Sequence, residues 1–585
     1  MYSNAAHFGS HSTAVCSAAI HDLPAEVLFL IFWSYLYGQD IARCMRVCRY
    51  FANLINSDVY LQYRIELAKN GMIDGPSGTL PVSERLERLR QYSSNFRNGI
   101  FNHEDITAHP DYLQQFLKIQ SRGRSRTETA GGVTSVLHIS DSDSRKYFLA
   151  VFVDPSEQAG IIDRAQDLFV TFEQCFDTGT NTWPFQLRLF SWSGLQVCQT
   201  DHPAAAAPRV QIWPLSAYPG NLPAQIQIHS TVIGGCYVVW NVFAMKDHVP
   251  SHSIHACNWR TGQMVSRIDL GATHHNFVLL DDTYILALPA ESDPDSDSEP
   301  PLLVFSLAPP SQSPATTRPL CCLQLPAVSL NPGERVVDRE MRTSRHPPTP
   351  NGHFHDDPSV SMVVLTYDLA MDGSAWPARS RTSYLLIPCA ALLAHLRLVS
   401  VVGASPDPDP PAPVPWEAWG PLMSLRLWAA VHPHADHFPG SIALVPYGSR
   451  MPVVVFEGPD CTRASVCVFE TNPLVVRHAR AIARSNSDLN SEAGSGGILE
   501  SRTRATVGSA IVEDVEAALP GVVDPECSAI PFVVYRFGIP LDMEEEQHAS
   551  RMIQAVRMSM TGFTVTVSSR DSATRPLRCA QRGIN

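Results

Sequence analysis

Apolar residues recur at helical spacing from Leu23 to about Phe101, and beyond about residue 130 they give way to short β-type runs. The first helical stretch reads LPAEVLFLIFWSYL. Pro24 suits the first position of a helix, where the missing N–H would have had no partner in any case. The turns that follow predict a helix with one complete apolar face, made of Val27, Leu28, Ile31, Phe32 and Leu36.

The remaining sides of this helix carry Phe29, Leu30 and Trp33, so it must be buried on more than one side. Asp40 is expected to cap a second helix, whose apolar stripe comprises Cys44, Val47, Cys48, Phe51, Leu54 and Ile55. Segments of about 40 residues rarely stabilise themselves, and each large apolar side chain left in water forgoes roughly 1.5–3 kcal/mol. The pattern therefore predicts that another surface covers the remainder.

A further helix is expected in VSERLERLRQYSSNF, with Leu86, Leu89 and Tyr92 on one stripe and Ser83 as its N-cap.

The whole sequence divides into four expected parts. They are a disordered tail at 1–19, a helical unit at 20–68, a helical linker at 69–130 and a β region at 131–585.

About a dozen runs such as SMVVLTYDL and GCYVVWNVF, separated by Gly, Pro, Asp and Asn and not by long helices, predict the strands of a sandwich, barrel or propeller. In CNWRTGQMVSRIDL, the turn from Trp259 to Gly262 resembles the outer hairpin of a WD-repeat propeller blade. We therefore expect an α+β multidomain fold, with a small helical unit followed by an all-β, propeller-like domain. The strand at 562–569 is expected to close that domain by pairing near 135–140.

The N-terminal residues resemble the F-box motif nearly position for position. They are Leu23-Pro24-x-Glu26-Val27-Leu28-x-x-Ile31-Phe32, then Leu36, Asp40, Cys44, Val47-Cys48-Arg49 and Phe51. The later SERLERLRQYSSNFRNG is similar to the helix that follows the F-box in many large fungal F-box proteins, whose remaining chain is a divergent β-propeller-like region. The resemblance implies that ten residues divide between the motif's own core and a contact with a Skp-type adaptor: Leu23, Pro24, Val27, Leu28, Ile31, Phe32, Leu36, Val47, Cys48 and Phe51.

The resemblance also implies a function. The chain would be the substrate-receptor subunit of a Skp–cullin–F-box ubiquitin ligase in the cytoplasm or nucleus, with a target protein bound by the β region and neither catalytic residues nor a cofactor. Three alternatives stay open. The chain could be a scaffold that acts with the adaptor outside a ligase, or an enzyme with polar residues around a propeller channel. The N-terminal helices could also pack entirely against the chain's own β domain.

The composition disfavours several classes of binding partner. The 44 Lys and Arg against 57 Asp and Glu give a net charge of -13, which disfavours sequence-independent binding to nucleic acid. Fourteen cysteines in 585 residues are too sparse for a disulfide scaffold, so reduced intracellular thiols are expected. The apolar run from Val27 to Trp33 is far shorter than the roughly 20 residues that span a bilayer, so no membrane partner is expected.

Other candidate chemistry is sparse. His432, His434 and His437 lie close together in HPHADHFPG and are of a type that binds zinc. They have no neighbouring cysteine or clear carboxylate partner, so a surface loop is the preferred interpretation and no metal site is assigned. The sequence contains neither a phosphate-binding glycine loop nor a nucleophile elbow.

Overall fold

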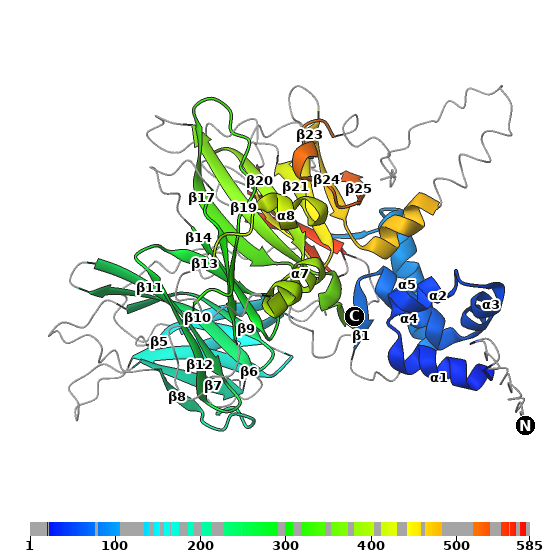
Figure 1. Cartoon of the computed structure of the whole chain (residues 1–585), viewed down its shortest axis with the longest axis horizontal. Coiled ribbons are helices and arrows are strands. Elements are labelled where there is room, and N and C mark those ends of the chain that lie inside the picture. Colours follow the sequence, from blue (N-terminus) through cyan, green and yellow to red (C-terminus); the bar gives the residue numbers. More distant parts are fainter. Residues whose placement is uncertain are drawn as a thin grey trace, which may run out of the picture.

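The computed structural model shows a group of N-terminal helices at one end of a larger β body (Figure 1). It describes residue 20, residues 23–75 and 80–105, and most of 134–580. The longest stretches outside the described residues are 1–19, 106–133, 213–225, 430–441, 482–518 and 539–551.

The N-terminal helices are α1 (Ala25–Tyr35), α2 (Gly38–Cys44), α3 (Arg49–Ser57) and α4 (Val59–Lys69). The first begins directly after Pro24, as predicted. The expected second helix is wrong, because the chain leaves helical geometry after Cys44 and starts again at Arg49, and Asp40 lies inside the first turn of α2. Cys48 instead caps α3, with its Sγ accepting a hydrogen bond from the Phe51 N–H at 3.5 Å.

These helices share a small core of their own. Its fully buried members are Leu28, Phe32, Ile41, Phe51, Ile55, Leu61 and Ile65. The rings of Phe32 and Phe51 meet edge to face at 5.7 Å. Gly38 starts α2 where that helix crosses α4, and the absence of a side chain there permits the close approach.

The β body contains four sheets that are each an antiparallel array of four strands, mostly in chain order. The first comprises β5 (Glu157–Asp163), β6 (Leu168–Gln174), β7 (Phe185–Ser191) and β8 (Arg209–Ile212). The second comprises β9 (Ile226–Gly234), β10 (Tyr237–Lys246), β11 (Val249–Asn258) and β12 (Gln263–Gly271). The third comprises β13 (His275–Leu279), β14 (Tyr284–Pro289), β15 (Leu302–Ser306) and β16 (Cys321–Leu323). The fourth comprises β17 (Glu334–Thr343), β19 (Met362–Met371), β20 (Arg379–Pro388) and β21 (Leu425–Ala429).

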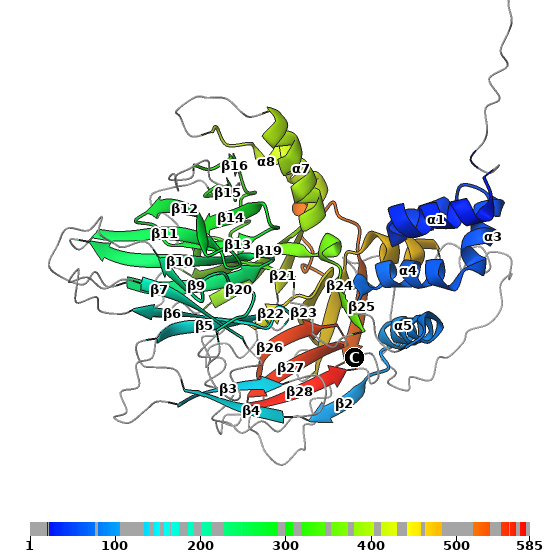
Figure 2. The same cartoon turned by 90° about the horizontal axis from the view of Figure 1, so that it is seen from below.

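The sheets stack face to face as propeller blades do. Successive apolar clusters lie between the first and second sheets, the second and third, and the third and fourth. The first strands β5, β9, β13 and β17 contact one another in that order, as the inner strands of a propeller would. The expected fold class, a helical unit followed by a propeller-like β region, is confirmed (Figure 2).

Two further sheets complete the described body. One holds β23 (Arg450–Glu457), β24 (Arg463–Glu470) and β25 (Val533–Gly538). The other has the order β2 (Asn102–Asp105), β28 (Thr574–Ala580), β27 (Gly562–Ser568), β26 (Met552–Ser559) and β22 (Ala443–Val445). Two shorter pairs join β3 (Thr134–Ser140) to β4 (Lys146–Phe152), and β1 (Met72–Asp74) to β18 (Phe354–Asp356).

The expected closure partner is wrong. Strand β27 pairs with β26 and β28, whereas β3 pairs with β4. The C-terminal strand β28 pairs instead with β2, so the last strand of the chain is held by a segment that directly follows the helices. The sequence of β2, Asn-His-Glu-Asp, has no apolar alternation, and its strand conformation depends on this pairing.

The hairpin predicted at Trp259–Gly262 is confirmed. It joins β11 to β12, and Gly262 has a φ of +72°, a conformation that favours glycine. Trp259 is buried, and its indole N–H donates to the Gly235 carbonyl at 3.2 Å.

Two helices depart from expectation. Helix α5 (Val82–Arg97) follows Pro81 with no side-chain cap, so Ser83 is not its N-cap. Helix α7 (Cys389–Val402) interrupts the run of strands, and it forms because Leu392 and Leu396 bury one stripe beside β20. Among the helices of the described residues, none has the length and apolar content needed to span a membrane.

Gly38→Ala tests the packing of the N-terminal helices. A Cβ at this position would lie 2.3 Å from the Arg64 carbonyl oxygen and 2.8 Å from the Ala68 Cβ. The gain of about 1 kcal/mol that alanine brings to a helix does not offset this clash, so a net loss of about 1–3 kcal/mol is expected. Urea unfolding followed by circular dichroism measures the loss. Gly538→Ala is the control, because an added Cβ meets nothing within 4 Å there, and equal stability of the two variants would contradict the packing.

Candidate protein-docking surface

The outer side of the N-terminal helices is apolar. Nineteen large hydrophobic side chains are exposed among the described residues, and eleven of them lie between residues 20 and 60. They are Ile20, Leu23, Val27, Leu30, Trp33, Tyr35, Tyr37, Val47, Tyr50, Val59 and Tyr60, and we call these eleven the apolar patch. A concentration of this kind is typical of a protein-binding surface.

The ten residues that the resemblance divides between the motif's core and the adaptor contact fall into three groups. Leu28, Phe32 and Phe51 are at most 4% exposed and belong to the core of the N-terminal helices. Partly buried positions beside that core are Ile31 and Leu36. The structure places the other five at the surface: Leu23, Pro24, Val27, Val47 and Cys48.

The sequence motif did not include three strongly exposed members of the apolar patch. Leu30 is 58% exposed, and Tyr35 and Tyr37 are 76% and 77% exposed. The sequence did show that the first helix is apolar on all sides. Apolar residues outside its core-facing stripe must face either water or a partner, and the sequence pattern does not distinguish between these two environments.

Trp33 is held in place at the edge of the apolar patch. Its ring stacks on Phe29 at 5.6 Å and meets Tyr60 of α4 edge to face at 6.1 Å. Arg64 donates to the Trp33 carbonyl at 2.6 Å and to the Phe32 carbonyl at 3.2 Å, which satisfies two carbonyls at the C-terminal end of α1. A bulky aromatic side chain fixed in this way is a typical binding anchor.

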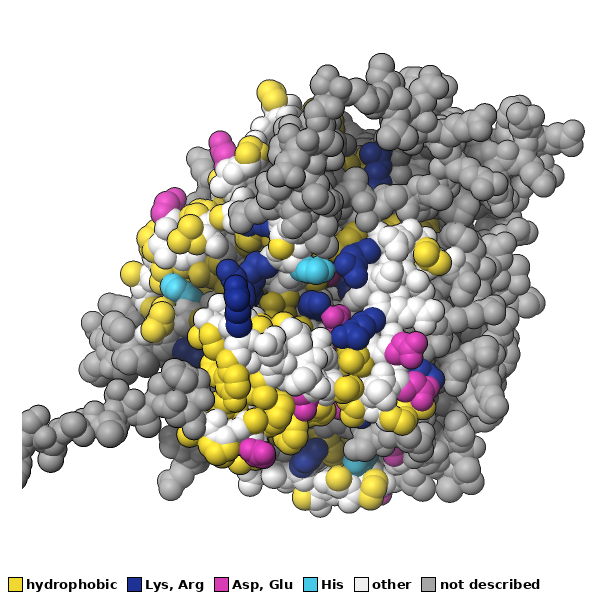
Figure 3. All heavy atoms as spheres, turned by 90° about the vertical axis from the view of Figure 1, so that its right-hand side faces the viewer, with side chains coloured by type: hydrophobic (Ala, Val, Ile, Leu, Met, Phe, Trp, Pro, Cys, Tyr) yellow, Lys and Arg dark blue, Asp and Glu magenta, His cyan; other side chains and the backbone are white. Residues whose placement is uncertain are grey.

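Figure 3 shows this end of the molecule as a surface. Hydrophobic side chains gather on the lower part of the face, and Lys and Arg side chains gather near its centre. The apolar area is therefore bordered by charge, as protein interfaces commonly are.

The helices are joined to the β body through α4 and α5 and not through the apolar patch. Tyr63 and Leu67 of α4, with Leu89 and Phe96 of α5, belong to one core together with β23, β24, β25 and β27. Phe96 packs edge to face on Phe537 at 5.5 Å. The alternative in which the N-terminal helices pack entirely against the β domain is therefore wrong for α1, α2 and α3.

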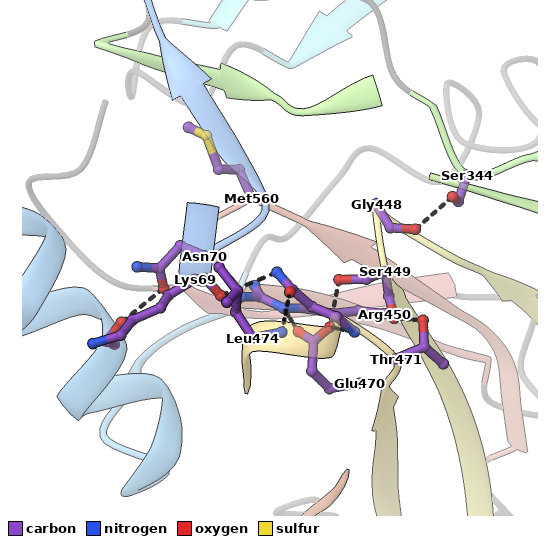
Figure 4. A network of polar contacts seen from close by, with 12 residues as sticks. Lys69, Asn70, Ser344, Gly448, Ser449, Arg450, Glu470, Thr471, Leu474 and Met560 are labelled. Carbon is purple, nitrogen blue, oxygen red and sulfur yellow. Dashed lines mark hydrogen bonds and ion pairs between the residues drawn. The ribbon is translucent and has the colours of Figure 1, made fainter. Parts of the chain in front are cut away.

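A buried polar network reinforces this junction (Figure 4). The Arg450 Nε donates to Glu470 Oε2 at 2.9 Å, and a second Arg450 nitrogen donates to the Tyr92 hydroxyl of α5. The Tyr92 hydroxyl in turn donates to the Met560 carbonyl at 2.6 Å. Burial raises the pKa of the Tyr92 phenol even though Arg450 opposes the shift, so the hydroxyl keeps the proton that it donates.

The same network reaches α4. Asn472 donates from its side chain to the Ala68 carbonyl at 2.9 Å, and its backbone N–H donates to Glu470 Oε1 at 2.9 Å. The last turn of α4 is thus hydrogen-bonded to a loop of the β body, so the position of the N-terminal helices is fixed by directed bonds as well as by packing.

In a comparison with known protein families, the F-box-like family model matches residues 20–68. The N-terminal helices form an F-box-like domain. A domain of this kind is a non-catalytic module that binds Skp-type adaptors, and it is typical of substrate receptors of Skp–cullin–F-box ubiquitin ligases.

The comparison with curated proteins finds no match. Among solved structures, an oligogalacturonate lyase in complex with manganese matches with 10% identity and a TM-score of 0.20, over 54% of this chain and 71% of that chain. A likeness at this level carries no argument about fold or activity.

The histidine-rich segment weighed on sequence falls where the structure gives no description. His432, His434 and His437 lie outside the described residues. Within the described residues there is no group of three or more His, Cys, Asp or Glu placed to hold a metal ion.

Glu470→Gln tests the junction behind the F-box-like domain. The variant would leave the guanidinium of Arg450 buried without a balancing charge, and breaking a buried pair in this way costs about 3–5 kcal/mol. Thermal and urea unfolding of the full chain should both shift to lower stability. The matched control is Asp269→Asn, which removes a partly exposed pair with Arg267 at 3.0 Å and should cost about 1 kcal/mol or less. Equal effects of the two variants would show that the buried pair does not hold the junction.

Proposed function

We propose that the chain is the substrate receptor of a Skp–cullin–F-box type ubiquitin ligase. The F-box-like domain docks a Skp-type adaptor, the adaptor links the chain to a cullin, and the β region binds a target protein. The observation that carries this proposal is the apolar patch, which the F-box-like domain leaves uncovered although its own core is complete.

The adaptor-contact residues that we propose come from the exposed faces of the helices. Leu23, Pro24, Val27, Val47 and Cys48 remain from the residues assigned on sequence, and the structure supports adding Leu30 and Trp33. The partly buried Ile31 and Leu36 support these contacts from below. An aromatic anchor that is fixed in place beside aliphatic side chains is an arrangement in which a few residues supply most of the binding free energy.

The junction supports a division of labour between the two ends of the molecule. Because α4 and α5 share a core with the β strands, an adaptor bound at the apolar patch would be held in a fixed direction relative to the β body. Loops on a rigid β scaffold are a common place for recognition sites. We propose that such loops bind the target, so that the target and the cullin-bound machinery are held at a defined separation.

Substitution of exposed apolar residues tests adaptor docking. Leu30→Asp combined with Val47→Asp places two carboxylates in the apolar patch, where Leu30 is 58% and Val47 is 69% exposed. Each anchor lost is expected to cost about 2 kcal/mol, so the affinity for a purified Skp-type adaptor should fall by about 100-fold or more. Isothermal titration of the full chain measures the affinity. Substitution of Leu28 is unsuitable here, because Leu28 is fully buried and its loss would test folding instead of docking.

The matched control is Leu422→Asp combined with Met371→Asp. These side chains are 87% and 45% exposed and lie on the β body. The control variant should bind the adaptor as the wild type does, and both variants should keep the wild-type melting profile. The proposal fails if the wild type does not bind a Skp-type adaptor, or if the patch variant binds as tightly as the control.

Co-purification with cullin separates the ligase role from the scaffold alternative. We expect the full chain to recover both adaptor and cullin from cells, and the patch variant to lose both together. Recovery of adaptor without cullin would favour a scaffold that acts outside a ligase.

A further inference from the structure

A cleft opens where the F-box-like domain meets the β body. It has a volume of about 150 Å³. Its walls come from α4, from α5, from the helix at 473–481 and from strands of the β23–β24–β25 sheet. Phe96 lines it, with the Arg450 guanidinium 4.4 Å from the centre of the Phe96 ring. The cleft is separate from the apolar patch, none of whose residues line it.

The cleft is cationic in a chain whose net charge is -13. Four basic side chains line it (Lys69, Arg90, Arg97 and Arg450) against two carboxylates (Glu66 and Glu470), which leaves a net charge of +2. Glu470 is fully committed to the buried network through Arg450 and Ser449. Glu66 is paired with Lys69 at 2.8 Å.

The two arginines of α5 that line the cleft, Arg90 and Arg97, form no ion pair with a carboxylate among the described residues. Arg90 donates to the Gln62 side-chain oxygen at 3.1 Å. Arg97 donates from Nε to the Ser93 carbonyl at 3.0 Å, which leaves both of its terminal nitrogens for another acceptor. A guanidinium in this condition is well suited to a doubly charged oxyanion, which it can bind through two parallel hydrogen bonds.

His478 stands at the rim of the cleft among these cations. Partial burial lowers the pKa of its imidazole, and the charges of Lys69 and Arg97 lower it further, against the opposing charge of Glu66. Lys69 of α4 and Arg97 of α5 therefore both contribute positive charge to the same cleft. A dianion in that volume would relieve their mutual repulsion and reverse their effect on His478.

We propose that this cleft binds a phosphate group, which bridges helices α4 and α5 and the β body. Arg97 and Arg90 of α5 supply the guanidinium contacts, and Lys69 of α4 adds its ammonium charge. His478 supplies a contact from the β-body side. The volume admits a free phosphate ion or the phosphate of a small phosphorylated metabolite. Bound there, the anion stabilises the junction that fixes the direction of the docking domain.

Titration of the full chain with inorganic phosphate tests this site. At neutral pH, with chloride at equal ionic strength as the reference, we expect saturable heat by isothermal titration and a higher melting temperature. Glycerol 3-phosphate forms the second arm. Tighter binding of the ester than of inorganic phosphate assigns the site to a small phosphorylated molecule, and equal binding assigns it to the free ion.

Three variants decide which residues are responsible. Arg90→Gln with Arg97→Gln should weaken phosphate binding at least tenfold. His478→Glu should do the same by placing a carboxylate at the rim, where the exposed side chain makes no hydrogen bond among the described residues. Arg46→Gln with Arg49→Gln removes the same charge from exposed positions outside the cleft and should bind like the wild type. The proposal is overturned if the wild type responds to phosphate no more than to chloride, or if the cleft variants bind as well as the Arg46/Arg49 control.

Discussion

The small helical unit at residues 23–69 can bury only part of its apolar side chains in a core of its own. Four short helices enclose a core of seven fully buried residues, and the geometry of their crossings leaves no room inside for the rest of their apolar side chains. Leu30, Tyr35, Tyr37 and Val47 face outward as a result. Since each large apolar side chain that stays in water forgoes roughly 1.5–3 kcal/mol, the F-box-like domain carries a strong tendency to bind a partner on that side.

The opposite side of the domain meets a different requirement. There α4 and α5 enter the core of the β body, and the buried charges of Arg450 and Glu470 satisfy each other and the surrounding hydrogen-bond donors. A directed network of this kind contributes modestly to net stability but specifies one arrangement of the two parts. One side of the domain thus exposes the apolar patch, and the opposite side is packed and hydrogen-bonded to the β body. A partner bound at the apolar patch would therefore keep a constant orientation relative to the β body.

Local sequence pattern predicted those parts of the structure that depend on neighbouring residues. Helix α1 and the hairpin at Trp259–Gly262 were both predicted, since a proline start and a positive-φ glycine turn act over a few residues. The break between α2 and α3 was missed because the apolar stripe from Cys44 to Ile55 fits one helix as well as two. In the structure Phe51 and Ile55 are buried in one core with Leu28, and a core shared by separate helices is not visible in the local pattern.

The local sequence pattern could not predict contacts between segments that are far apart in the chain. The pairing of β2 with β28 joins segments from opposite ends of the chain, and β2 is polar throughout. Similarly, nothing in the sequence around Glu470 marks it as the centre of a buried network. The F-box resemblance placed Leu28 and Val27 in one set of residues, and only the side-chain exposures separate the core residue Leu28 from the surface residue Val27.

Hydroxyl-radical footprinting of the full chain, alone and with a purified Skp-type adaptor, shows whether the adaptor covers the apolar patch. Trp33, Tyr35, Tyr37 and Tyr50 should be oxidised in the free chain and protected in the complex. Met245 and Met371, which are 37% and 45% exposed on the β body, should be oxidised equally in both. Unchanged oxidation of the four aromatic residues in the presence of a bound adaptor would contradict the account.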